Sequence, residues 1–140
     1  MFSIRLLPPV RRGSEGQRLG EIVVGGFREV FSCYPAGARV DDLPSVWRAE
    51  LAALVRGERV ALLRHDPRFA WVVYREGEEC FVQQRLSIDG EFHGLLPRVV
   101  TTEDGAPVSE WPTSLAAICQ YLDGELGAAR QDRQEGGHRS

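Results

Sequence analysis

The sequence predicts an α+β fold in which an antiparallel sheet of about four to six strands carries two main helices. Short segments of alternating or β-branched residues follow one another between tight turns, which predicts strands that neighbour strands. Two other segments repeat their apolar residues at helical spacing. The sequence has no repeating strand–helix–strand unit, so an antiparallel sheet is favoured over a parallel one.

The amino-terminal part predicts two strands. Phe2 to Leu7 forms a short first strand, which Pro8-Pro9 ends. Arg11 to Gly20 is polar and glycine-rich without periodicity, and predicts a loop. Glu21 to Phe31 is β-branched and aromatic, so it predicts a second strand, with a bulge or bend at Gly25-Gly26.

The first helix is predicted from Asp42, a candidate N-cap, to Gly57, a natural carboxyl-terminal stop. Pro44 falls in the first turn, where its missing N–H costs nothing. The apolar stripe of this helix is Trp47, Leu51, Leu54 and Val55.

Three further strands are expected next. Arg59 to Arg64 precedes a turn, and Phe69 to Arg75 is apolar on both faces, as in a central strand. Gly77 then allows a tight hairpin turn. In the returning strand, one buried face is expected to hold Cys80, Val82, Leu86 and Ile88, and a largely polar face to hold Phe81, Gln83, Arg85 and Ser87.

The region from Asp89 to Pro107 is irregular, and a final helix follows it with Thr113 as the expected cap. We expect residues 1–126 to form one domain and residues 127–140, which lack any apolar period, to form a disordered tail. The buried stripe of the final helix is Leu115, Ile118, Cys119 and Leu122.

Length and composition limit the class of protein. The chain has 140 residues, 43% of them apolar, enough for one core. No apolar run approaches the roughly 20 residues that span a bilayer, and no secretory leader is recognisable, so a cytoplasmic location is expected. The three cysteines have unrelated spacings, which predicts reduced thiols and neither disulfides nor a zinc site.

The net charge of −3 is unevenly distributed. Residues 1–75 carry an excess of positive charge, whereas residues 76–125 contain ten acids and only two arginines. Nucleic acid requires a basic surface, so a direct nucleic-acid ligand is disfavoured. A basic protein partner fits the acidic segment better.

Motifs for catalysis are nearly absent. No nucleophile elbow or phosphate loop is present, and His65, His93 and His138 lack metal-ligand spacing, so no metal or cofactor is expected. The acids of the irregular region suit a partner surface or a solvated loop better than general acid–base chemistry. The candidate partner contacts are Asp89, Glu91, His93, Glu103, Asp104 and Glu110.

Several segments, in this order, resemble the immunity proteins of bacterial contact-dependent growth inhibition. They are Gly20–Val23, Trp47–Leu51 with Leu54 and Gly57, the aromatic hairpin Ala70–Gln84, Phe92–Gly94, Thr101–Gly105 and Val108–Trp111. The resemblance extends from about Gly20 to Leu126.

This resemblance implies a cytoplasmic protein that neutralises the toxic carboxyl-terminal domain of a contact-delivered effector. Neutralisation in such a family is stoichiometric occlusion without cofactor or turnover, and the toxins are nucleases, with tRNA one target class. A regulatory or scaffold module and, less favoured, a small enzyme stay open as alternatives.

Overall fold

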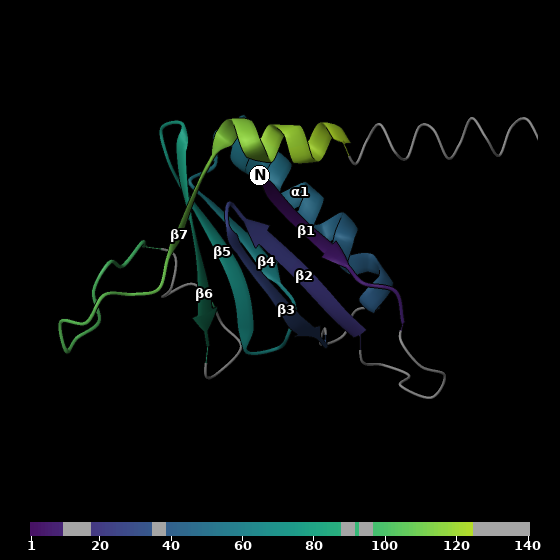
Figure 1. Cartoon of the computed structure of the whole chain (residues 1–140), viewed down its shortest axis with the longest axis horizontal. Helices are drawn as coiled ribbons and strands as arrows, with labels where there is room; N and C mark the ends of the chain where they lie inside the picture. The colour runs from purple at the N-terminus through teal and green to yellow at the C-terminus, as the bar shows by residue number, and fades with distance from the viewer. Residues whose placement is uncertain (10–17, 35–38, 88–91, 93–96, 125–140) are drawn as a thin grey trace, which may run out of the picture.

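The strands of the computed structural model form two antiparallel sheets (Figure 1). The structure describes residues 1–9, 18–34, 39–87, 92 and 97–124. The amino-terminal sheet has the order β1 (Phe2–Leu6), β2 (Arg18–Val24) and β3 (Phe27–Cys33). The carboxyl-terminal sheet has the order β4 (Val60–Arg64), β5 (Phe69–Glu76), β6 (Glu79–Leu86) and β7 (Trp111–Ser114).

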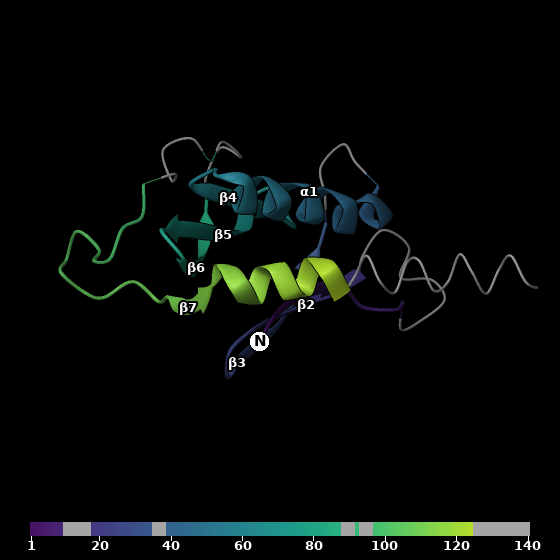
Figure 2. The same cartoon turned by 90° about the horizontal axis from the view of Figure 1, so that it is seen from above.

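Two main helices complete the fold. A short 3-10 turn, η1 (Val40–Asp42), leads into α1 (Leu43–Arg56), which lies along the β4 edge and also contacts β1. A second helix, over residues 115–124, crosses one end of the space between the two sheets (Figure 2). The predicted α+β class with two main helices is confirmed, although the strands divide between two sheets. Neither described helix is long and apolar enough to cross a bilayer.

The expected bend at Gly25-Gly26 is a hairpin turn. Val24 pairs with Phe27 across it, so the predicted single strand is in fact the β2–β3 hairpin. Gly25 has a φ of +60°, a conformation that glycine adopts without steric cost. The chain can therefore reverse within two residues.

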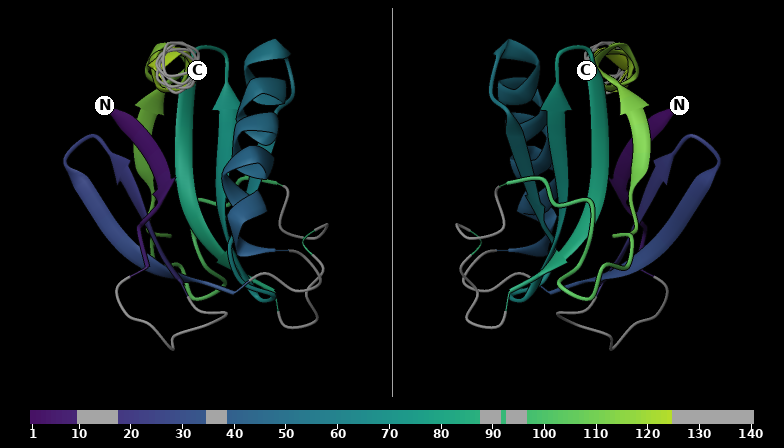
Figure 3. Two further views of the ribbon diagram at one scale, coloured as in Figure 1. Left: turned by 90° about the vertical axis from the view of Figure 1, so that its right-hand side faces the viewer. Right: turned by 90° about the vertical axis from the view of Figure 1, so that its left-hand side faces the viewer.

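The main core lies between the sheets and includes residues of α1 and of the second helix (Figure 3). Trp47 and Trp71 are fully buried in it, as expected from their positions in the sequence. The Trp47 indole also donates a hydrogen bond to the Arg64 carbonyl oxygen at 2.8 Å. This bond joins α1 to the otherwise unpaired edge of β4, where a free carbonyl would invite another strand.

Two predicted details of the carboxyl-terminal half are wrong. Ser114 caps the second helix in place of Thr113, since its hydroxyl oxygen accepts a hydrogen bond from the Ala117 N–H at 3.1 Å. Thr113 is paired with Cys80 in the sheet instead. Leu86, expected in the core, is 50% exposed, because it lies at the end of β6 beyond the pairing with β7. Ile88 and residues 127–140 lie outside the described residues.

Candidate partner-binding site

The outer face of β5 and β6 is the platform for the candidate site. Side chains alternate along a strand, so Val73 and Val82 enter the main core while Tyr74, Phe81 and Gln83 point to the opposite face. That face was expected to be polar, and Gln83 is completely buried there. A later segment of the chain therefore covers the polar face.

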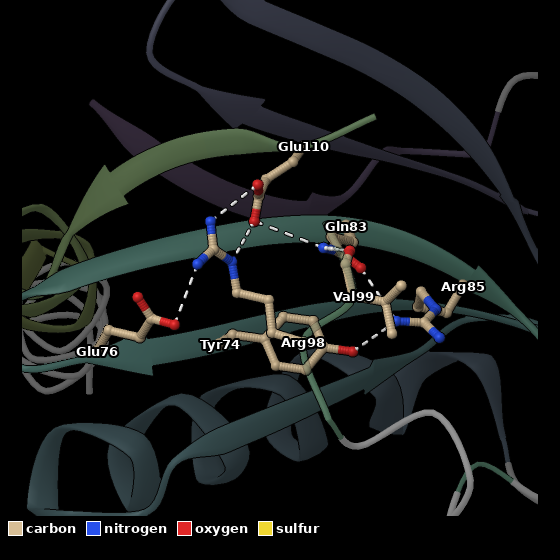
Figure 4. A network of polar contacts seen from close by, with 7 residues as sticks. All are labelled: Tyr74, Glu76, Gln83, Arg85, Arg98, Val99 and Glu110. Carbon is tan, nitrogen blue, oxygen red and sulfur yellow. Dashed lines mark hydrogen bonds and ion pairs between the residues drawn. The ribbon is translucent and has the colours of Figure 1, made fainter. Parts of the chain in front are cut away.

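Arg98 attaches this covering segment to the sheet (Figure 4). Its guanidinium lies 3.7 Å from the centre of the Phe81 ring, a cation–π contact. It donates two parallel hydrogen bonds to Glu110, from Nε to Oε1 at 2.6 Å and from Nη2 to Oε2 at 3.0 Å. A third bond joins Nη1 to the Glu76 carboxylate at 3.0 Å. These bonds, chiefly those to Glu110, raise the pKa of Arg98 above its already high value, so the guanidinium stays charged.

The buried amide of Gln83 makes the second attachment. Its Nε2 donates to the Val99 carbonyl oxygen at 3.0 Å and lies 3.5 Å from Glu110 Oε1. Its Oε1 accepts a hydrogen bond from Arg85 at 3.0 Å, and Arg85 also donates to the Tyr74 hydroxyl oxygen at the same distance. A buried amide without partners would be costly, so these bonds favour one position of the covering segment.

Residues 99–109 form a hairpin that we call the arm. The Thr102 N–H donates to the Ala106 carbonyl, and the Val108 N–H donates to the Val100 carbonyl, at 2.8 and 3.0 Å. The turn between them closes with a bond from the Gly105 N–H to Thr102, and Gly105 has a φ of +82°. The arm extends from the body of the molecule as the green loop in Figure 1.

The structure separates the six predicted contact residues. Glu103 and Asp104 lie exposed in the turn of the arm. Glu110 stands at its base with a side chain only 17% exposed, and Arg98 occupies both of its oxygens. Asp89, Glu91 and His93 lie outside the described residues.

Two exposed apolar side chains of the arm could not be recognised from the sequence as possible partner contacts. Val99 and Val100, where the arm begins, are 38% and 54% exposed. Valine is typical of strand interiors, so a pair of valines in an irregular region predicts burial rather than exposure. The arm thus presents apolar and acidic groups together, a composition that suits contact with another protein.

Outside the arm, the described chain also contains a cavity and buried thiols. A cavity of about 570 Å³ lies where the end of α1 meets β4, and its lining contains side chains of both charges. Burial raises the pKa of the Cys33 thiol to about 12 and that of the Cys80 thiol to about 11, so neither forms a nucleophilic thiolate at neutral pH. Among the described residues, no three side chains of histidine, cysteine or acids gather as a metal site.

Comparison with known proteins agrees with the sequence resemblance. The chain is 24% identical over 130 residues to the immunity protein CdiI of Enterobacter cloacae subsp. cloacae. The alignment covers 81% of this chain and 90% of that protein. The resemblance to contact-dependent growth inhibition immunity proteins is confirmed. The alignment thus spans most of CdiI. No protein-family model matches the chain.

The fold is also shared with a solved structure. The chain superimposes on a chain of the CdiA-CT/CdiI toxin and immunity complex from Enterobacter cloacae with a TM-score of 0.68. This match covers 89% of the present chain and 97% of the other, at 22% sequence identity. At that identity the superposition shows a common fold.

Proposed function

We propose that this chain is an immunity protein that binds the toxic carboxyl-terminal domain of a contact-dependent growth inhibition effector and neutralises it. The similarity to CdiI over 81% of the chain carries this proposal. The fold shared with a chain of a toxin and immunity complex supports it. In this role the protein acts in the cytoplasm as a stoichiometric inhibitor, with no cofactor and no turnover.

The arm is the proposed toxin-facing surface. Glu103 and Asp104 are the charged residues of the arm, and Arg98 neutralises Glu110 at its base. Two exposed carboxylates at the tip of the arm and two exposed valines at its start suit a toxin surface that carries both basic and apolar groups. Asp89, Glu91 and His93 stay in the proposal as contacts predicted from the sequence.

A nuclease is the class of toxin that fits this charge. The cleft of a nuclease must attract phosphate, so its surface is positively charged and an acidic inhibitor can occupy it. The acidic segment from residue 76 to residue 125 supports this assignment. Direct binding of nucleic acid by this chain is not part of the proposal.

Co-expression tests the function. Cells that produce the candidate cognate toxin domain should stop growing, and production of this chain should restore their growth. With purified proteins, toxin activity should fall in proportion to added chain and vanish near one equivalent. Complete inhibition by a small fraction of one equivalent would indicate catalysis instead, and absence of any protection would contradict immunity.

A further inference from the structure

The two ends of the arm are fixed to each other. Arg98 and Glu110 are 12 residues apart and stand on either side of residues 99–109, joined by the two parallel bonds described above. Paired bonds between a guanidinium and a carboxylate fix the relative orientation of the two groups as well as their distance. Both side chains are less than a quarter exposed, so water competes little for these bonds. The base of the arm thus has one defined geometry.

The same base is attached to the carboxyl-terminal sheet. Phe81 and Gln83 both belong to β6 and pair with β5, and Phe81 also pairs with β7. Gln83 holds the backbone of Val99, the first residue of the arm. Among the described residues, the hydrogen bonds of residues 100–108 stay within the arm. The direction in which the tip points is therefore set at the base, by Gln83, Arg98 and Glu110.

We propose that Gln83, Arg98 and Glu110 are positioning residues for toxin recognition, which orient the arm before the toxin arrives. This inference rests on the proposed function. In this arrangement Glu110 acts by holding the Arg98 guanidinium and does not contact the toxin. An arm that samples the binding orientation a tenth of the time weakens the apparent affinity about tenfold, even when every contact residue is intact.

The test compares Arg98→Lys with a matched variant, Arg75→Lys. Lysine keeps the charge but cannot make two parallel bonds to a carboxylate. Arg75 also donates several hydrogen bonds, but they go to the Leu54 carbonyl of α1 and the Gly77 carbonyl of the β5–β6 turn and not to the arm. Its replacement therefore reports the general effect of losing an anchored arginine. Glu110→Gln serves as a second change in the base.

Two measurements separate positioning from mere stability. NMR relaxation of the free protein gives backbone order parameters for residues 102–108. These should fall from about 0.85, a value typical of rigid backbone, to below about 0.6 in Arg98→Lys and Glu110→Gln. Toxin affinity should fall roughly tenfold in both variants. The salt dependence of the toxin association rate should not change, because the charges of Glu103 and Asp104 are still present. Arg75→Lys should change neither order parameters nor affinity.

Three results would overturn the inference. The first is a mobile arm that binds the toxin as tightly as the native protein. The second is an equal loss of affinity in Arg98→Lys and Arg75→Lys, which would indicate a general loss of stability. The third is an arm that stays rigid in both base variants. If the native protein itself fails to bind the toxin domain, the proposed function fails, and this inference fails with it.

Discussion

The imidazole of His65 donates a hydrogen bond from Nδ1 to the carbonyl oxygen of Ser32 at 2.9 Å, which joins the two sheets. The backbone adds a second link, since the Tyr34 N–H donates to the His65 carbonyl oxygen. The ring is almost completely buried and packs against Phe31, with ring centres 4.6 Å apart. Burial lowers the pKa of His65, although the bond to Ser32 and the charge of Asp66 oppose the shift.

The protein should therefore lose stability at mildly acidic pH. The folded state holds His65 neutral, while the unfolded chain takes up a proton below about pH 6.5. The contribution of the neutral His65 ring to the free energy of unfolding is fully present above that pH. It declines as the pH falls, by up to about 1.4 kcal/mol per pH unit. Chemical denaturation between pH 5 and pH 8 measures it. His65→Leu, which cannot titrate, should show a smaller slope, and an equal slope in both proteins would contradict the assignment.

Truncation of either buried tryptophan should be strongly destabilising. Trp47→Ala and Trp71→Ala each remove a fully buried side chain and should cost roughly 3–5 kcal/mol of unfolding free energy. Trp47→Phe, which keeps a ring but loses the bond to the Arg64 carbonyl, should cost less. Denaturant titration gives these values, and a loss below about 1 kcal/mol for either alanine variant would show that its side chain is not in the core.

Gly20 is required by a close approach between two strands. A Cβ at this position would lie 2.6 Å from two atoms of the Phe31 ring and 3.0 Å from the Cys33 sulfur. The ring cannot move freely because it packs against both His65 and Trp47. Gly20→Ala should therefore cost about 1–3 kcal/mol through overpacking. Gly26→Ala, which meets no atom within 4 Å, is the control and should change stability little.

Charge reversal at the tip of the arm should slow toxin association. Glu103→Arg with Asp104→Arg replaces attraction by repulsion, and the rate should fall most at low salt, where screening is weakest. Stability should hold, because exposed charges contribute little to it. Glu78→Arg with Glu79→Arg makes the same change of charge at two exposed positions where the β5–β6 turn enters β6, and should affect association less. Equal rates for the native protein and the arm variant at low salt would move the toxin-facing surface elsewhere.

Deletion of residues 127–140 should leave both folding and protection intact. This expectation comes from the sequence, because the segment lacks an apolar period that a core could use. Unfolding by denaturant and survival of toxin-producing cells are the two measurements. Loss of protection by a truncated protein that folds and accumulates normally would assign a function to this segment.

Local patterns in the sequence determined most of the elements. The stripe of Trp47, Leu51 and Leu54 predicts α1, and all three side chains are buried. Gly57 and Gly77 mark its end and the β5–β6 turn, where both adopt positive φ. The same local patterns could not distinguish a bend at Gly25 from a hairpin turn, because two adjacent glycines allow either.

The tertiary structure alone decided the organisation of the candidate site. The acids of the irregular region were recognisable in the sequence, but nothing in their spacing shows that Glu110 is occupied by Arg98 while Glu103 and Asp104 are exposed. Gln83 looked like an exposed polar residue of a half-buried strand, and it is buried because Val99 and Glu110 lie over it. These partners are 16 and 27 residues away from Gln83 along the chain. Periodicity reports only neighbours within a turn or a strand, whereas hydrogen bonds and ion pairs form between whichever groups the fold brings together.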